Sequence, residues 1–139
     1  GRFCTVFYEG TFTRIGDAPE KTPEYADVTG EWQGDLPLVR DECSVQINPL
    51  HETNHVTFNG IMTTIVGSDF RVLTGNWETV RSLFATISNV PSGANFPVQD
   101  TISYEDITNG AATVTVTHFD GNMGCTTTWK GQMRHTGPQ

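Results

Sequence analysis

Basic residues are scarce in this chain of 139 residues, and no two of them are adjacent. Eight Lys and Arg stand against sixteen Asp and Glu, which gives a net charge of −8. Nucleic acids and anionic membrane surfaces are bound by clustered positive charge, which this chain lacks. We therefore expect neither as a partner, and we interpret the acidity as favouring solubility.

Long apolar runs and common catalytic signatures are also absent. No apolar run approaches the roughly 20 residues that a membrane-spanning helix requires, so we expect no membrane insertion. Gly1 opens directly into strand-like sequence without a signal peptide, as either a processed chain or an expression boundary would. The chain contains no G-x-S-x-G, no C-x-x-C and no Gly-rich phosphate loop. We expect no cofactor, and the sequence favours a protein that is not an enzyme without excluding one.

Cysteine is limited to Cys4, Cys43 and Cys125. Cys4 lies in the first expected strand and Cys125 opens the last. A Cys4–Cys125 disulfide would close a loop of more than about 100 residues and stabilise the fold by about 4 kcal/mol. Cys43 would then be buried and free, or would pair between chains. With this disulfide we expect a secreted or extracytoplasmic protein; the alternative is a cytosolic chain with three reduced cysteines.

Alternation of apolar and polar side chains is the main pattern that the chain does contain. Such alternation, rich in Val, Ile, Thr and aromatic residues, is typical of half-buried β-strands. It predicts strands over residues 3–15, 28–34, 43–47, 55–66, 70–77, 98–107, 113–119 and 125–133. Glycine-containing turns at 67–69 and 120–124 join two pairs of these strands into expected hairpins, and Asn109-Gly110 marks another tight turn.

Residues 76–89 are ambiguous between helix and strand. Trp77, Val80, Leu83 and Ile87 recur at helical spacing, whereas the same segment also alternates at period two, and its β-branched residues weaken a helix. We therefore expect an all-β single domain over residues 1–139, with at most one short helix near 77–89. Its architecture is expected to be one antiparallel β-barrel of about eight or nine strands, with a β-sandwich as the alternative.

Glycine and an aromatic residue recur two positions apart within the expected strands. The pairs are Gly10 and Phe12, Gly30 and Trp32, Phe58 and Gly60, Gly75 and Trp77, and Trp129 and Gly131. Glycine lets a strand bend sharply, and an aromatic ring on the same face can cover the gap. Strands that coil this strongly favour a small barrel. The aromatic residues are then core, or one or two of them line an interior cavity.

Three short segments resemble the calycin group, and within it the avidin-type biotin barrels. Gly30-Glu31-Trp32, followed by Asp35-Leu36, is similar to an opening G-x-W strand. The segments 72–75 (VLTG) and 127–132 (TTWKGQ) are similar to strands of avidin-type barrels. The resemblance implies a calycin-like or avidin-like barrel shape. It does not extend to biotin binding, because the positions implied for the ureido ring hold Gly34 and Leu38, which lack polar side chains.

The segment 51–55 matches the zinc motif H-E-x-x-H, with His51 and His55 as ligands and Glu52 as base. That chemistry requires a helix, which turns residues four apart toward one ion. Pro49 precedes the segment and strand-like sequence follows it, so we interpret it as a turn between strands. The alternative is a metal site with His118 or an aspartate as third ligand.

His118 and several carboxylates are the candidates for acid–base chemistry. His118 shares an expected strand face with Val114 and Val116, so it is either a locally hydrogen-bonded histidine or a general acid or base in a cavity. Glu9, Glu31 and Glu105 lie on expected strands and could face inward. A shift of one residue in register would reverse each of these orientations.

The leading functional hypothesis is a small secreted protein that binds an apolar or aromatic molecule in the barrel. Trp32, Phe58, Met62, Trp77 and Trp129 would form the wall of its cavity. One alternative is a self-assembling extracellular or virion subunit that uses strand edges, and a homo-oligomer is compatible with either hypothesis. A second alternative is a barrel enzyme, such as a cyclase or isomerase, that works with one carboxylate or His118.

Overall fold

The structure, a computed structural model, describes residues 28–59, 62–67 and 71–138, and these residues form nine β-strands and no helix. In this described part, no helix has the length and apolarity needed to cross a lipid bilayer. The strands are β1 (Gly30–Leu36), β2 (Leu38–Asp41), β3 (Leu50–Asn59), β4 (Met62–Val66), β5 (Val72–Thr79), β6 (Ser82–Asn89), β7 (Val98–Thr108), β8 (Ala111–Asp120) and β9 (Cys125–Pro138).

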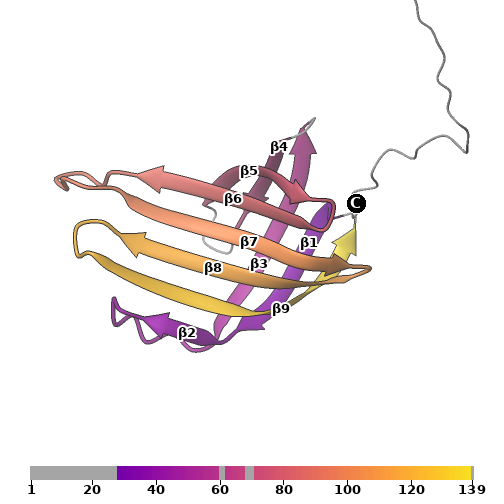
Figure 1. Cartoon of the computed structure of the whole chain (residues 1–139), viewed down its shortest axis with the longest axis horizontal. Helices are drawn as coiled ribbons and strands as arrows, with labels where there is room; N and C mark the ends of the chain where they lie inside the picture. The colour runs from indigo at the N-terminus through magenta and orange to yellow at the C-terminus, as the bar shows by residue number, and fades with distance from the viewer. Residues whose placement is uncertain (1–27, 60–61, 68–70, 139) are drawn as a thin grey trace, which may run out of the picture.

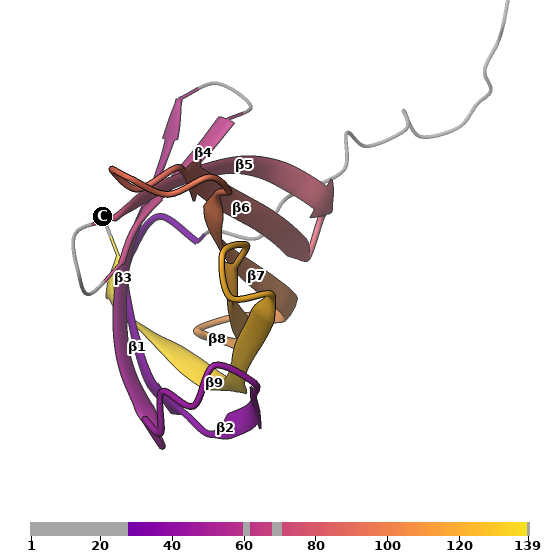
Figure 2. The same cartoon turned by 90° about the vertical axis from the view of Figure 1, so that its left-hand side faces the viewer.

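The strands form a closed antiparallel barrel. Their order is β1-β3-β4-β5-β6-β7-β8-β9, and β9 pairs back with β1 to complete the ring, while β2 is added beside β9. Figure 1 shows β6 to β9 crossing in front of the more steeply inclined β1 and β3, and Figure 2 looks along the ring from one end. The predicted single β-barrel is thereby confirmed, and the sandwich alternative is not adopted.

Strands β1 and β2 run one after the other along β9, with Pro37 between them. Proline has no N–H to donate to a ladder, but its carbonyl still accepts a hydrogen bond from the Lys130 N–H at 3.0 Å. Gly131 is required opposite this break, because a Cβ there would lie 2.8 Å from Pro37 Cδ. The chain therefore changes direction at Pro37 while β9 continues past it.

The inner face follows the alternation of the strands and carries the core. Its buried apolar side chains come from all eight ring strands, and include Leu36, Val56, Ile65, Leu73, Leu83, Ile102, Tyr104, Val114 and Met133. Gly75 lies where β5 and β6 approach closely, since a Cβ on it would be 1.7 Å from the Phe84 carbonyl oxygen. Three glycine–aromatic pairs lie wholly in β1, β5 and β9. The others involve Gly10, Phe12 and Gly60, which lie outside the described residues.

Trp32 closes one end of the barrel. Its side chain is fully buried, and its Nε1–H donates to the Val28 carbonyl oxygen at 2.9 Å. The indole stacks on His135, with ring centroids 4.7 Å apart and planes inclined by 4°. It also meets Tyr104 edge to face at 5.3 Å. The side-chain rings of Trp32, His135 and Tyr104 therefore pack against one another and fill this end of the barrel.

The segment 76–89, which is ambiguous between helix and strand in the sequence, contains no helix. Residues 72–89 form the hairpin β5–β6, with Trp77 opposite Leu83 and Gly75 opposite Ala85. The segment could satisfy either periodicity locally, and pairing with β4 on one side and β7 on the other selects the strand. β-branched residues, which fit a pleated surface, agree with that outcome.

Two strand boundaries also differ from the prediction. The expected strand at 43–47 is a loop, in which Ser44 and Gln46 have positive φ angles of 58° and 61°. The strand lies earlier, at β2, between the two strands expected at 28–34 and 43–47. The expected strand at 55–66 is divided between β3 and β4, which pair with each other. As a result, the alternate residues that face inward on β3 do not continue the same odd or even numbering on β4. The strand predicted at 3–15 lies outside the described residues.

The predicted Cys4–Cys125 disulfide is wrong, because Cys125 is bonded to Cys43, with their Cα atoms 5.2 Å apart. Cys43 follows β2, which lies beside β9, so the loop that begins there runs against the start of β9. The Glu42 N–H donates to the Thr126 carbonyl oxygen at 2.9 Å, and the Thr126 N–H donates to Glu42 Oε1 at 3.0 Å. Cys4 lies outside the described residues.

Candidate functional site

A pocket of about 330 Å³ lies at the barrel end opposite Trp32, which we call the mouth. The loops 42–49, 90–97 and 121–124 lie at this end of the barrel, and we call the first of them the rim loop. Figure 2 views the barrel from this side. The pocket is lined by Val45, Ile47, Leu50, Glu52, Arg71, Asp100, Val116, His118 and Trp129. Apolar side chains of the rim loop, β3, β8 and β9 thus share one space with four ionisable residues.

An aspartate and a histidine on adjacent strands form the centre of the polar side. Asp100 on β7 and His118 on β8 are register partners, and alternation turns both inward, beside Ile102 and Val116. His118 Nδ1 lies 2.8 Å from Asp100 Oδ1. Since an ionised carboxylate can only accept a hydrogen bond, the hydrogen in this contact is carried by Nδ1. Arg71 makes an ion pair with Asp100 from the other side.

A second buried carboxylate, Glu52, lies on β3, across the pocket. It alternates inward with Asn54 and Val56, and only 8% of its surface is exposed. Asn54 donates through Nδ2 to the Tyr104 hydroxyl at 2.9 Å, and burial raises the pKa of that hydroxyl strongly. Among the described residues, Asn54 Oδ1 and Thr63 Oγ1 are buried without a hydrogen-bond partner. The inner face therefore becomes more polar from Tyr104 toward the mouth.

The rim loop is fixed to the barrel by several contacts besides the Cys43–Cys125 disulfide. Asp41 accepts hydrogen bonds from the backbone N–H groups of Val45 at 2.8 Å and Gln46 at 2.9 Å. Trp129 Nε1–H donates to the Ile47 carbonyl oxygen at 2.9 Å, which holds the indole against this loop. The loop thereby presents the half-exposed side chains of Val45 and Ile47 to the pocket.

Acidification is expected to weaken this attachment. Desolvation raises the pKa of Asp41, but the N–H groups of Gln46 and Val45 and the Thr127 hydroxyl outweigh it and hold the pKa below its ordinary value of 3.8. Because the pKa of Asp41 is lower in the folded state, the ionised carboxylate stabilises the fold. This contribution is fully present above pH 3.8 and is lost as the pH falls through the folded-state pKa. Asp41→Asn should lower the thermal midpoint at neutral pH, and its deficit should vanish in strong acid.

Thermal melts followed by circular dichroism across this pH range would measure the effect. Asp106→Asn is the control, because Asp106 is exposed on β7, away from the rim loop, and Asn tolerates its positive φ of 51°. The thermal midpoint of Asp106→Asn should change with pH in the same way as the midpoint of the wild-type protein. A constant deficit for Asp41→Asn at every pH would contradict a role for the Asp41 charge.

The aromatic residues predicted to form one wall lie in three places. Trp129 lines the mouth pocket, whereas Trp32 is buried in the closed end. Phe58 and Trp77 stack on each other with centroids 5.7 Å apart, half-buried at the edge of the core. Met62 points outward from β4 and is 49% exposed, because the inward-facing residues of this strand are its neighbours in the alternation, Thr63 and Ile65. The structure therefore does not bring these five side chains together.

The candidate catalytic residues also separate. His118 faces the pocket, as its alternation with Val114 and Val116 indicated. Glu31 and Glu105 lie in outward phase on β1 and β7, and Glu9 is outside the described residues.

Of the two carboxylates that do reach the pocket, Glu52 was named from the sequence only as the base of the zinc motif, and Asp100 was not singled out. Period-two alternation with Val56 and with Ile102 was the signal that could have found them.

The H-E-x-x-H segment lies in β3, so the turn expected there is wrong, and the segment is not a helix either. His51 and His55 are exposed on its outer face, and four residues along a strand separate them by roughly 13 Å. Two ligands at that spacing cannot bind one ion. In the described part of the chain, no group of three or more His, Cys, Asp or Glu residues is arranged to hold a metal.

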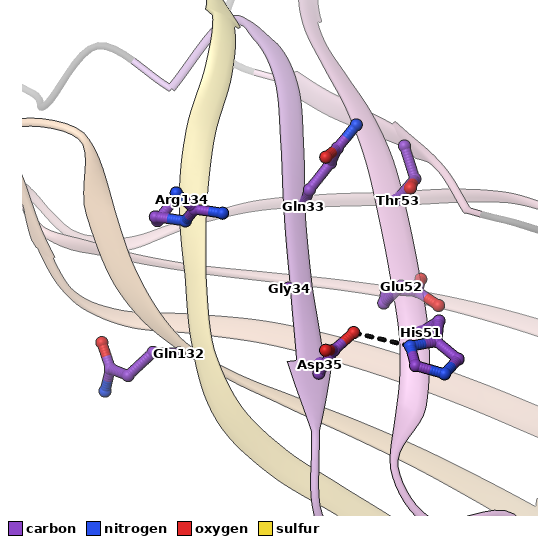
Figure 3. A pocket seen from close by; sticks show the side chains of 8 residues that line it. All are labelled: Gln33, Gly34, Asp35, His51, Glu52, Thr53, Gln132 and Arg134. Carbon is purple, nitrogen blue, oxygen red and sulfur yellow. Dashed lines mark hydrogen bonds and ion pairs between the residues drawn. The ribbon is translucent and has the colours of Figure 1, made fainter.

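A second hollow of about 370 Å³ lies on the outer face of β1, β3 and β9 (Figure 3). Its lining is polar and consists of Gln33, Gly34, Asp35, His51, Glu52, Thr53, Gln132 and Arg134. The dashed line in Figure 3 joins His51 Nδ1 to Asp35 Oδ1 at 2.6 Å, and both side chains are more than half exposed. The hollow lacks an apolar wall, so the mouth pocket is the stronger candidate site.

The mouth pocket can hold an apolar body against Trp129, Val116 and Ile47 while Glu52, Asp100 and His118 contact a polar group. The acceptor nitrogen of a neutral His118 could also take a proton from a bound molecule. Comparisons with protein-family models, with curated proteins and with solved structures find no match to this chain.

Proposed function

We propose that this protein binds a small molecule with an apolar or aromatic body in the mouth of its barrel. The observation that carries the proposal is the mouth pocket, which combines a mostly apolar wall with a few convergent polar groups. Small-molecule sites have this composition, and their volumes begin at about 300 Å³. The ligand body would lie against Trp129, whose ring orientation is fixed by the Ile47 carbonyl.

The Cys43–Cys125 disulfide supports an extracytoplasmic setting for this binding protein. Disulfides persist in oxidising compartments and are rare in the cytosol. Self-assembly through strand edges receives less support, because among the described strands the ring is closed and the short β2 has the one unpaired edge.

Binding of N-phenyl-1-naphthylamine, an uncharged dye that fluoresces in apolar sites, would test the proposal. Val116→Phe adds bulk to the pocket wall and is expected to weaken dye binding roughly tenfold, which corresponds to about 1.4 kcal/mol. Val72→Phe is the matched control, since Val72 lies outside the pocket and is 46% exposed. Its affinity should equal that of the wild type.

Two results would contradict the proposal. No dye binding by folded wild-type protein, together with no response to a panel of other aromatic compounds, would remove the binding function. Equal weakening by Val116→Phe and Val72→Phe, with both variants folded by circular dichroism, would place the binding outside the mouth pocket.

The His118–Asp100 pair favours proton-transfer catalysis as a second candidate function. A carboxylate that orients a histidine inside a pocket is a common general-base arrangement. Mass spectrometry of bound compounds after incubation would detect turnover. His118→Gln should then abolish turnover while keeping binding, and unchanged compounds with the wild-type protein would exclude this function for them.

A further inference from the structure

The mouth pocket stops well short of the closed end of the barrel. On β3, β7 and β8, the next inward-facing residues beyond the pocket lining are Asn54, Ile102 and Val114. Each of these residues has at most 3% of its surface exposed. Protein interiors are packed as densely as organic crystals, so side chains buried to this extent leave no room for a ligand between them. The pocket therefore has a defined depth.

One hydrogen bond crosses the barrel at this depth. Asn54 on β3 donates through Nδ2 to the Tyr104 hydroxyl on β7 at 2.9 Å. In the closed ring, three strands separate β3 from β7 on either side, and Figure 2 shows the two strands on opposite sides of the ring. Separating the two buried groups would leave a donor unpaired away from water, which is unfavourable. The bond therefore resists opening for a ligand.

A third side chain completes this partition. Met133 on β9 is fully buried, and its Sδ lies 3.8 Å from Asn54 Nδ2. On the side away from the pocket, Tyr104 meets the indole of Trp32 edge to face. We call Asn54, Tyr104 and Met133 the floor. The floor separates the mouth pocket from the closed end, which Trp32 fills.

The space above the floor sets the size of the ligand body. An apolar cavity of about 150 Å³ holds one benzene molecule. The mouth pocket, at about 330 Å³, therefore holds a body of about two fused rings, such as naphthalene. A long alkyl chain could be buried over its whole length only if the cavity continued along the barrel axis. The floor prevents such a continuation.

We propose that the floor makes the mouth pocket selective for compact apolar bodies of about two fused rings and keeps long alkyl chains out of the barrel interior. This inference rests on the proposed binding function and specifies its ligand class. It gives Asn54, Tyr104 and Met133 a role in ligand specificity, although the pocket lining itself comes from other residues. Each further methylene group of a ligand strengthens binding only while there is space to bury it.

Naphthalen-2-ol and decan-1-ol test this preference, because they have the same number of carbon atoms and one hydroxyl group each but differ in shape. Displacement of the naphthylamine dye from the wild-type protein would measure both affinities. The naphthol should bind about tenfold more tightly, because part of the decanol chain would remain in water. Decanol is the more apolar compound, so hydrophobicity alone favours it. Equal or tighter binding of decanol would overturn the inference and leave the proposed binding function standing.

Asn54→Ala tests the floor directly, because Asn54 follows Glu52 of the pocket lining on the inner face of β3. The space that it frees should raise the affinity for decanol relative to the naphthol at least about fourfold, the gain from burying one methylene group. Asn76→Ala is the matched control, since Asn76 is exposed on the outward face of β5. Its affinity ratio should equal that of the wild type. An unchanged ratio in folded Asn54→Ala, or an equal rise in both variants, would contradict the role of the floor.

Met133→Ala provides the same test if Asn54→Ala does not fold, and it should also raise the affinity for decanol relative to the naphthol. Its matched control is Met62→Ala, because Met62 is 49% exposed on the outward face of β4. An unchanged ratio in folded Met133→Ala would overturn the inference. Absence of any binding of dye, naphthol or decanol by the wild-type protein would remove the proposed function itself, and the inference with it.

Discussion

A Trp32→Ala variant is expected to lose about 4 kcal/mol of unfolding free energy, a large part of the roughly 5–15 kcal/mol available to a domain of this size. The indole is fully buried and fills the closed end of the barrel. Its removal leaves a cavity, deprives the Val28 carbonyl of its donor, and removes the surface on which His135 stacks. Urea unfolding followed by far-ultraviolet circular dichroism would measure the loss.

Trp77→Ala is the control for this prediction. Trp77 is half-buried and stacks on Phe58 at the edge of the core, so the same substitution should cost about half as much. If Trp32→Ala costs no more than Trp77→Ala, the closed end is not packed as described. Because Trp32 lies far from the mouth pocket, dye affinity of the folded variant should change little.

Removing the disulfide with Cys43→Ala and Cys125→Ala together is expected to cost about 4 kcal/mol. The bond joins residues 82 apart, and closing a loop of that length restricts the unfolded chain by about this free energy. The thermal midpoint should fall by about 10 °C or more. Ligand binding should weaken as well, because Val45 and Ile47 line the pocket from the loop that the bond holds.

Peptide mapping under non-reducing conditions checks the pairing directly. A peptide containing Cys43 should be linked to one containing Cys125, and a Cys4–Cys125 link would contradict the structure. The Cys4→Ala variant keeps the described bond and serves as the stability control. A full loss of stability in that variant, with none in the double variant, would reverse the assignment.

Local alternation was sufficient to predict an all-β chain and much of its inward face. The pattern of Val114, Val116 and His118 correctly indicated that these side chains share one face. The glycine–aromatic pairs indicated strong coiling, and Gly75 and Gly131 do lie where backbones approach closely. Alternation alone did not decide between strand and helix at 76–89, where a second periodicity fits the same residues, and it did not reveal that 55–66 is divided between two strands.

The site was only partly predictable. Trp129 and His118 were named as candidates because of their residue types and their positions on expected strand faces. Glu52 was interpreted only as part of a metal motif, and Asp100 was not singled out. The disulfide partner of Cys125 depended on β2 lying beside β9, a pairing between segments more than 80 residues apart in the chain. No pattern within either segment encodes that pairing.

Period-two patterning in the sequence by itself determined strand content, because the alternation of side chains is a property of each strand alone. The tertiary structure decided which residues meet, because register and closure depend on pairing between distant strands. That pairing places Asp100 beside His118 and fills one end of the barrel with Trp32. At the other end, the rim loop folds against Trp129 and leaves the pocket on which the proposed function depends.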